Sequence, residues 1–273
     1  MKRGDNKKYL LNSPLKFKLY LMVKLKNKHD IEMIARSGRI LAEVLKKISK
    51  EAREGVSLDS LENLSRRLLK EADAKPAFLG YRSSSGHQPF PAALCLSLNE
   101  QVVHGLPSPY KLNSGDLLKI DLGVDYKGYI SDAAVTLGIG KISPTAQKLI
   151  EAVKKSLAAA INEARAGKHL GDLGYAIETT VKKAGFKVIK GLTGHGVGFK
   201  LHEDPTILNY GGKGEGQNLK PGMVLAIEPM ACLGRDRIVQ WPDDSFATAD
   251  GSLTAHFEHT VAVTENDPLV LTL

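Results

Sequence analysis

Apolar residues recur at helical spacing in the first third of the chain and predict two helices there. The first helix follows Asp30, which we take as its N-cap, and continues to a stop at Gly55. The second follows Ser57 and ends before a loop-like stretch, 76–91, that is rich in proline, glycine and serine. The apolar positions on the two helices are Ile34, Leu41, Leu45 and Ile48, then Leu61, Leu64 and Leu68. Each set lies along one side of its helix, so each helix is expected to bury that side.

The same pattern returns in the middle of the chain and predicts a second pair of helices. Ser143 suits an N-cap, and Pro144 suits the first turn. This helix stops at Gly167, and the next one runs to Gly185. Their buried positions are expected at Leu149, Val153, Leu157 and Ile161, then at Leu173, Ile177 and Val181.

Elsewhere the apolar residues form short runs, which are typical of strands. Residues 117–138 are predicted to form an antiparallel hairpin that turns within the DYKG segment. Further strand and loop segments are expected at 92–98, 102–105, 191–199, 223–230, 237–241 and 255–263. Helices combined with antiparallel strands predict a fold of the α+β class.

Four carboxylates stand in apolar strand segments, where acidic side chains are uncommon: Asp121, Asp132, Glu228 and Glu258. The predicted hairpin brings Asp121 close to Asp132. Buried carboxylates repel each other unless one takes up a proton or a cation lies between them. Two such aspartates on their own would more often be solvated turn or edge residues. Four such residues favour oxygen-rich ligation of a divalent metal.

The chain also contains an internal repeat. Segments 115–121 and 222–228 share a glycine, two apolar residues, an isoleucine and a final carboxylate at the same spacing, 107 residues apart. Segments 51–61 and 163–173 match at an offset of 112 residues. Such a repeat is too long for a solenoid unit and instead predicts two pseudo-symmetric halves that share one sheet and one site.

Three histidines beside glycine or apolar residues are candidates for the same site: His104, His195 and His202. The glycines that flank His195 allow close backbone approach. A single such histidine would more often be a core residue with satisfied hydrogen bonds, but beside four buried carboxylates a ligand role is favoured. By strand alternation His256 shares the face of Glu258 and can reach the edge of the site, whereas His259 points away.

Basic residues are concentrated in a leader at the start of the chain. The chain has 273 residues, of which 42% are hydrophobic and 25% charged, as in ordinary globular proteins. Residues 1–28 hold nine Lys or Arg and one acidic residue, which equals the whole net charge of +8. We expect this leader to be a solvated tail, with RNA or an anionic surface as the alternative contact. Translation that begins at Met22 would omit most of it.

Two further features narrow the class of protein. No apolar run approaches the roughly 20 residues that span a bilayer, and segment 19–23 is too short for the core of a signal peptide. The two cysteines, Cys95 and Cys232, give no disulfide framework. We therefore expect a cytoplasmic protein with no membrane partner.

Five motifs occur in the order in which a known family carries them. They are 99–107 (NEQVVHGLP), the hairpin with Asp121 and Asp132, 194–205 (GHGVG followed by HEDP), 220–230 (KPGMVLAIEPM) and 257–260 (FEHT). Together they resemble methionine aminopeptidase of type I over about residues 28–273. The resemblance implies a pita-bread fold, in which pseudo-two-fold halves surround a curved antiparallel sheet and a central dimetal site. The halves are expected at about 28–140 and 141–273, after a flexible basic extension of residues 1–27.

The resemblance implies five metal ligands in this sequence: Asp121, Asp132, His195, Glu228 and Glu258. By this similarity Asp132 and Glu258 bridge two divalent ions, Asp121 chelates one, and His195 with Glu228 completes the other. Cobalt, manganese or iron is expected, with zinc as an alternative.

The resemblance also implies roles toward the substrate. Glu228 is expected to act as the base, while His104 and His202 contact the substrate and stabilise the tetrahedral intermediate. Cys95 and Phe90 match positions in the pocket for the methionine side chain. Leu201 departs from the family's pattern, and the region around Trp241 does not align cleanly. The resemblance therefore does not predict the shape of the pocket.

The implied activity is removal of N-terminal methionine from nascent proteins and peptides by a water molecule activated between two metal ions. The implied partners are nascent chains and, through the leader, the ribosome, and a monomer is expected. One alternative is a proline-directed aminopeptidase or prolidase on the same fold, but residues 1–28 are too short for the extra domain that those enzymes usually carry. The other is a non-enzymatic pita-bread protein that binds RNA or the ribosome, but such proteins tend to lose metal ligands.

Overall fold

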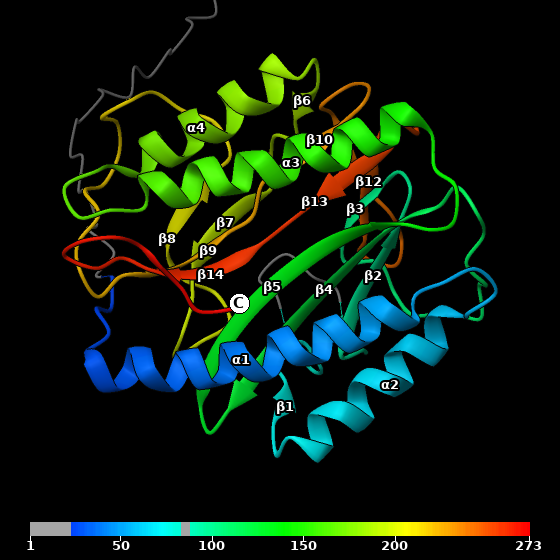
Figure 1. Ribbon diagram of the computed structural model, residues 1–273, viewed down its shortest axis with the longest axis horizontal. Helices are drawn as coiled ribbons and strands as arrows, with labels where there is room; N and C mark the ends of the chain where they lie inside the picture. Colours follow the sequence, from blue (N-terminus) through cyan, green and yellow to red (C-terminus); the bar gives the residue numbers. More distant parts are fainter. Residues whose placement is uncertain (1–22, 83–87) are drawn as a thin grey trace, which may run out of the picture.

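Each half of the chain starts with a pair of helices that is followed by a series of antiparallel strands (Figure 1). The computed structural model describes residues 23–82 and 88–273. The helices of this part are α1 (Lys28–Glu51), α2 (Leu58–Glu71), α3 (Pro144–Glu163) and α4 (Leu170–Lys183). The strands of the first half are β1 (Lys75–Pro76), β2 (Leu94–Leu98), β3 (Gln101–Val103), β4 (Leu117–Tyr126) and β5 (Tyr129–Gly138). Those of the second half are β6 (Lys187–Val188), β7 (Thr193–Gly196), β8 (Glu203–Leu208), β9 (Val224–Ile227), β10 (Met230–Cys232), β11 (Ile238–Gln240), β12 (Phe246–Thr248), β13 (Thr254–His256), β14 (His259–Ala262) and β15 (Leu269–Val270).

The start of α1 differs from its sequence prediction. Its N-cap is Asn27, three residues before Asp30. The Asn27 side chain accepts from the backbone N–H of Asp30, and the Asp30 carboxylate accepts from the backbone N–H of Asn27. The prediction of Asp30 as N-cap was wrong, because this reciprocal capping box satisfies two backbone donors with one residue pair. The prediction of Ser143 as an N-cap is confirmed, and α2 begins after Ser57, as predicted, with Ser57 as its N-cap.

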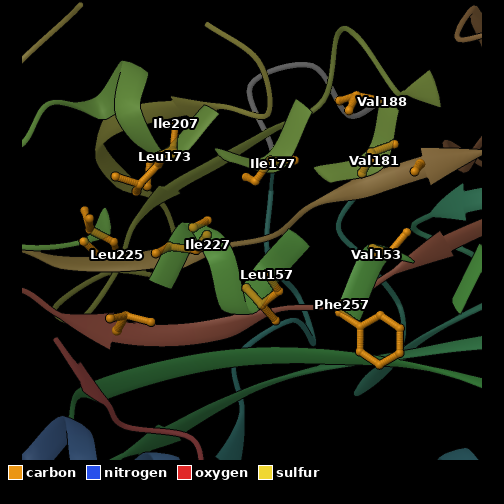
Figure 2. Packing of buried hydrophobic residues seen from close by; sticks show 14 of the residues in the cluster. Val153, Leu157, Leu173, Ile177, Val181, Val188, Ile207, Leu225, Ile227 and Phe257 are labelled. Carbon is orange, nitrogen blue, oxygen red and sulfur yellow. The ribbon is translucent and has the colours of Figure 1, made fainter. Parts of the chain in front are cut away.

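Each helix pair covers its own group of strands, as the repeat predicts. In the first half, α1 and α2 bury their apolar sides with β2 and β4 in one core, which includes Leu41, Leu61 and Ile120. In the second half, Val153 and Leu157 of α3 and Val181 of α4 pack toward β9 and the segment after β13 (Figure 2). Figure 1 shows α3 and α4 above the strands and α1 and α2 below them, with β5 and β14 between the two helix pairs.

The two halves join along β5 and residues 256–260. Ala134 and Glu258 exchange backbone hydrogen bonds, with N···O distances of 2.9 and 3.4 Å. On one side of this pair, the Thr260 hydroxyl accepts from the N–H of Asp132 and donates to its carbonyl, each at 2.8 Å. On the other side, the Thr136 hydroxyl binds both backbone groups of His256 in the same way, at 2.8 and 2.6 Å. Asp132 and His256 therefore occupy equivalent places about a local two-fold axis.

The described end of the basic leader lies against the domain. Lys26 is buried, forms an ion pair with Glu203, and donates its backbone N–H to the carbonyl of Gly222. Val23 packs at the edge of the second apolar core. This part of the predicted 1–27 extension is folded, whereas residues 1–22, including Met22, lie outside the described residues. No helix within residues 23–82 and 88–273 combines the length and apolar character needed to cross a bilayer.

The threonine seam, formed by Thr136 and Thr260, gives a test of how the halves are held together. Thr260→Val keeps the side-chain shape but leaves a buried N–H and carbonyl of Asp132 unpaired, so it should lower the free energy of unfolding by about 1–3 kcal/mol. Urea denaturation of metal-free protein measures this change. Thr145→Val, the same swap at an exposed position of α3, should stay within about 0.5 kcal/mol of the wild type. Equal stability of the two variants would contradict the role of the seam.

Candidate metal centre

The four strand carboxylates meet at the middle of the molecule. Asp121 comes from β4 and Asp132 from β5, and the hairpin register places Asp132 opposite Gly123. Glu228 follows the last residue of β9, and Glu258 precedes the first residue of β14. All four are between 3% and 9% exposed. Carboxylates so close together and so little hydrated require a proton or a cation.

Two of these carboxylates stand where strands are interrupted, which the sequence pattern did not predict. The expected strand 223–230 is divided into β9 and β10, and the expected strand 255–263 is divided into β13 and β14. β9 pairs with β14, whereas β10 pairs with β13, so both strands change sheets at the same level. Because the interruptions fall at Glu228 and Glu258, both side chains lie at the junction between the two sheets.

His195 on β7 brings a nitrogen to this junction. Its Nδ1 lies 3.0 Å from the carbonyl oxygen of Gly196 and can only donate to it, which leaves Nε2 as the free, unprotonated nitrogen. Nε2 lies 3.5 Å from Oε1 of Glu228 and 3.9 Å from Oδ2 of Asp132. A ring held in this way presents a lone pair to the carboxylates, as metal-binding histidines do.

The glycine before His195 makes this approach possible. A Cβ on Gly194 would lie 2.4 Å from the carbonyl oxygen of Ala226, on the neighbouring strand β9. The absence of a side chain lets β7 and β9 come together, and Cα of His195 pairs with Ala226. The glycine beside His195 therefore allows the close backbone approach that the sequence predicted.

Burial determines the charge state of the metal-free site. It raises the pKa of Asp121 to about 7, and the carboxylate of Glu228 adds to this rise while His256 opposes it. Burial also raises the pKa of Asp132, Glu228 and Glu258 well above the ordinary value. In contrast, burial lowers the pKa of His195 to about 4, so its imidazole is neutral at neutral pH.

The donor set fits a divalent cation. Among the described residues, Oδ1 of Asp121, Oδ1 of Asp132 and Oε1 of Glu258 are buried and have no hydrogen-bond partner. Ligand atoms of Asp132, His195 and Glu258 lie within 4.8 Å of one another, as do those of Glu228, His256 and Glu258. Asp121 belongs to neither group, although its carboxyl is in hydrogen-bond range of Asp132. A cation would satisfy orphaned oxygens that no protein donor reaches.

His104 and His202 face the carboxylates across a cavity of about 910 Å³ that both line. The ring centroids of His202 and His195 lie 4.3 Å apart in an edge-to-face arrangement. Partial desolvation and the neighbouring His195 and His104 lower the pKa of His202, an exposed residue, to about 3, and burial lowers the pKa of His104. His104 follows β3 in a left-handed backbone conformation, with φ of 62°. Such a conformation is uncommon for a residue with a side chain and recurs at functional sites.

Tyr81 belongs to this site although no sequence pattern indicated it. Its hydroxyl lies 2.6 Å from Nδ1 of His202, and the two rings are in edge contact. Because Nδ1 pairs with this hydroxyl, Nε2 is the nitrogen of His202 that is left for contacts in the cavity that both residues line. The pairing spans more than a hundred residues of sequence, so no local pattern could have indicated it.

An apolar cluster forms part of the wall of this cavity. Phe78, Cys95 and Leu201 form its buried part, and Phe90 packs against them. Cys95 lies directly opposite Asp121 in the pairing of β2 with β4, so the cluster begins beside the carboxylates. Burial, with the nearby Asp121, raises the pKa of the Cys95 thiol, which stays protonated. Both residues matched to a side-chain pocket, Phe90 and Cys95, therefore line this cavity.

The remaining histidines divide as strand alternation predicts. Nε2 of His256 lies 4.0 Å from Oε2 of Glu258, which confirms that the two share a face. His259 points away and contacts the Thr272 hydroxyl at 2.9 Å. His29 lies on α1 and His169 caps the start of α4, while His87 lies outside the described residues.

Titration of the buried carboxylates predicts a pH-dependent affinity for metal. Below a pH of about 7 Asp121 holds a proton that a cation must displace, so affinity should rise with pH, by about tenfold per unit for each displaced proton. Calorimetric titration of metal-free protein with Mn²⁺ between about pH 6 and pH 8 measures this slope. Repeating it in buffers of different ionisation enthalpy counts the protons. An affinity that is constant over this range would contradict the protonated carboxylates.

Comparison with known proteins places this chain in a family. A family model described as metallopeptidase family M24 matches residues 32–265. The chain is 45% identical over 257 residues to a methionine aminopeptidase of Aquifex aeolicus, and the match covers 92% of this chain and 99% of that protein. It is 38% identical over 252 residues to methionine aminopeptidase 1 of Bacillus subtilis, with 92% and 99% covered.

Solved structures agree with the sequence matches. The crystal structure of a methionine aminopeptidase from Thermotoga maritima superposes with a TM-score of 0.87 at 40% identity, covering 92% of this chain and 99% of that chain. A prolidase from Pyrococcus horikoshii gives a TM-score of 0.73 at 22% identity, and the match covers 63% of that chain. The second likeness concerns the fold alone. Together they confirm the α+β pita-bread fold.

Proposed function

The chain belongs to metallopeptidase family M24, and we propose that it is a methionine aminopeptidase, a hydrolase that removes N-terminal methionine from nascent proteins and peptides. The observation that carries the proposal is the convergence of four buried carboxylates and His195 on a cavity that an apolar cluster also lines. The full-length similarity to methionine aminopeptidases supports the choice of substrate.

Five residues would hold two divalent ions: Asp121, Asp132, His195, Glu228 and Glu258. Their donor set, four carboxylates and one imidazole, suits manganese, iron or cobalt, and zinc is the alternative. When bound, such ions polarise the scissile carbonyl and lower the pKa of a water molecule.

The side chains around the ions supply proton transfer and orientation. Glu228 would accept the proton of the attacking water and pass it to the leaving amine. His202 is neutral at physiological pH, and with Tyr81 paired to its Nδ1, its Nε2 is left for contacts in the cavity. His202 and His104 would donate hydrogen bonds to the oxygen that develops negative charge.

The apolar side of the cavity would select the substrate. Phe78, Phe90, Cys95 and Leu201 offer aromatic, thiol and aliphatic surface without a charged group. An unbranched, polarizable methionine side chain can fill such an irregular apolar space. Leu201, where the chain departs from the family's pattern, supplies part of this surface.

A proline-directed aminopeptidase or prolidase is the alternative on the same fold, and peptide specificity separates it from a methionine aminopeptidase. Metal-free protein should not cleave a Met-Ala-Ser peptide or an Ala-Pro-Ala peptide. Addition of manganese or cobalt should release methionine from the first peptide alone, as chromatography of the products would show. Cleavage before proline would instead assign the proline-directed peptidase activity. Absence of cleavage by metal-loaded protein would favour a non-enzymatic binding protein.

Substitution of Glu228 tests the proposed base. Glu228→Gln keeps the size of the side chain but removes the proton acceptor, so kcat on Met-Ala-Ser should fall by about 10²–10⁴-fold. Bound metal is measured on the same sample, so that loss of activity is compared at equal metal content. Glu265→Gln, at an exposed position after β14, should leave kcat unchanged. A metal-loaded Glu228→Gln variant with wild-type kcat would refute the role of Glu228.

We further propose that the enzyme acts as a monomer in the cytoplasm and contacts the ribosome through its basic leader. The support is the charge of residues 1–28 and the nature of the proposed substrate, a nascent chain. Deletion of residues 1–22 leaves the described domain whole and should weaken cosedimentation with ribosomes at low salt. Unchanged cosedimentation would remove the leader from this role.

A further inference from the structure

His256 is a buried histidine beside the candidate metal centre for which the five-ligand arrangement has no use. It is 1% exposed, and neither ring nitrogen has a hydrogen-bond partner among the described residues. Its Nε2 lies 3.5 Å from Oε2 of Glu228 and 4.0 Å from Oε2 of Glu258. A buried imidazole without partners is costly, so its position beside two carboxylates needs an explanation.

The carboxylate of Glu228 lies between two imidazoles, and each oxygen faces one of them. Oε1 is 3.5 Å from Nε2 of His195, and Oε2 is 3.5 Å from Nε2 of His256. His195 lines the cavity together with Glu228, but His256 is not among the lining residues. The two oxygens therefore differ: one faces the cavity, and the other faces a histidine behind it.

We propose that His256 is a positioning residue, whose Nε2–H donates to Oε2 of Glu228 and fixes the orientation in which Oε1 faces the metal centre. The inference deepens the proposed function and rests on it for the identity of Glu228 as a ligand. A carboxylate that binds a cation through one oxygen leaves the other in need of a donor. Such partners behind the ligands commonly set the orientation and the affinity of a metal site.

Interactions with two neighbouring segments fix the backbone of His256. The Thr136 hydroxyl binds both its backbone N–H and its carbonyl, and its Cα pairs with Met230, two residues after Glu228. By the local two-fold axis, His256 occupies the place that Asp132 occupies in the first half. The second half therefore presents an imidazole behind the carboxylates where the first half presents a carboxylate.

Three substitutions distinguish a donor at the Nε2 position from other roles. The amide nitrogen of Gln reaches about as far as Nε2 of histidine, whereas that of Asn reaches only as far as Nδ1. His256→Leu has no donor. His29→Leu, at an exposed position of α1, is the matched control for the loss of an imidazole.

The experiment is calorimetric titration of each metal-free variant with Mn²⁺, with kcat and KM on Met-Ala-Ser measured in parallel. His256→Leu and His256→Asn should bind Mn²⁺ about 10–100-fold more weakly than the wild type. His256→Gln should recover most of the wild-type affinity, and His29→Leu should retain it. Circular dichroism shows whether each variant is folded, and the difference between the Gln and Asn variants does not depend on the stability of the Leu variant.

Two results would overturn the inference. Wild-type affinity in His256→Leu would show that Glu228 needs no donor there. Affinity as weak in His256→Gln as in His256→Leu would show that the ring nitrogen itself is required, as in direct metal ligation. The proposed function fails separately: a wild-type chain that binds Mn²⁺ but releases no methionine would refute it and leave this inference intact. A wild-type chain that binds no Mn²⁺ would overturn both.

Discussion

The burial of four carboxylates in one place is the constraint on which this structure depends. Each loses hydration and each repels the others, so without a counter-charge their pKa values rise until protons neutralise them. Asp121, with a pKa raised to about 7, shows the size of the effect. A protein retains such a cluster when a cation makes it favourable, and the unpaired oxygens mark where that cation would bind.

Much of the surrounding architecture serves to hold these charges together. The β4–β5 hairpin supplies two carboxylates, and the interruptions of the second-half strands supply the other two at the junction of two sheets. Thr136 and Thr260 replace regular strand pairing where the halves meet, each with one hydroxyl that serves two backbone groups. The four carboxylates are thus anchored on strands or directly at strand ends, which limits how far mutual repulsion can move them.

Local sequence patterns predicted the parts of the molecule that local physics determines. Helical faces, the caps Ser57 and Ser143, and the hairpin all follow from apolar periodicity and turn chemistry. The cap of α1 was misplaced because Asn27 and Asp30 are both good capping residues, and only the reciprocal bonds decide between them. The strand interruptions at Glu228 and Glu258 could not be predicted, because continuous apolar runs cannot show that a strand changes sheets.

For the site too, the sequence predicted some features and missed others. The repeat and the apolar setting of the four carboxylates indicated that they converge, and strand alternation placed His256 beside Glu258. Tyr81 and the two seam threonines were missed because their partners, His202, Asp132 and His256, are distant in sequence. A hydroxyl group acquires such a role only through the tertiary fold, so its residue carries no signal of its own.

Whether the buried carboxylates bind a cation can be seen in crystals of the manganese-loaded protein, where anomalous diffraction locates the metal. We expect anomalous density among the carboxylates of Asp121, Asp132, Glu228 and Glu258, beside Nε2 of His195. Density elsewhere, or an ordered site in which these carboxylates bind no manganese, would contradict the role of the cluster as a metal centre.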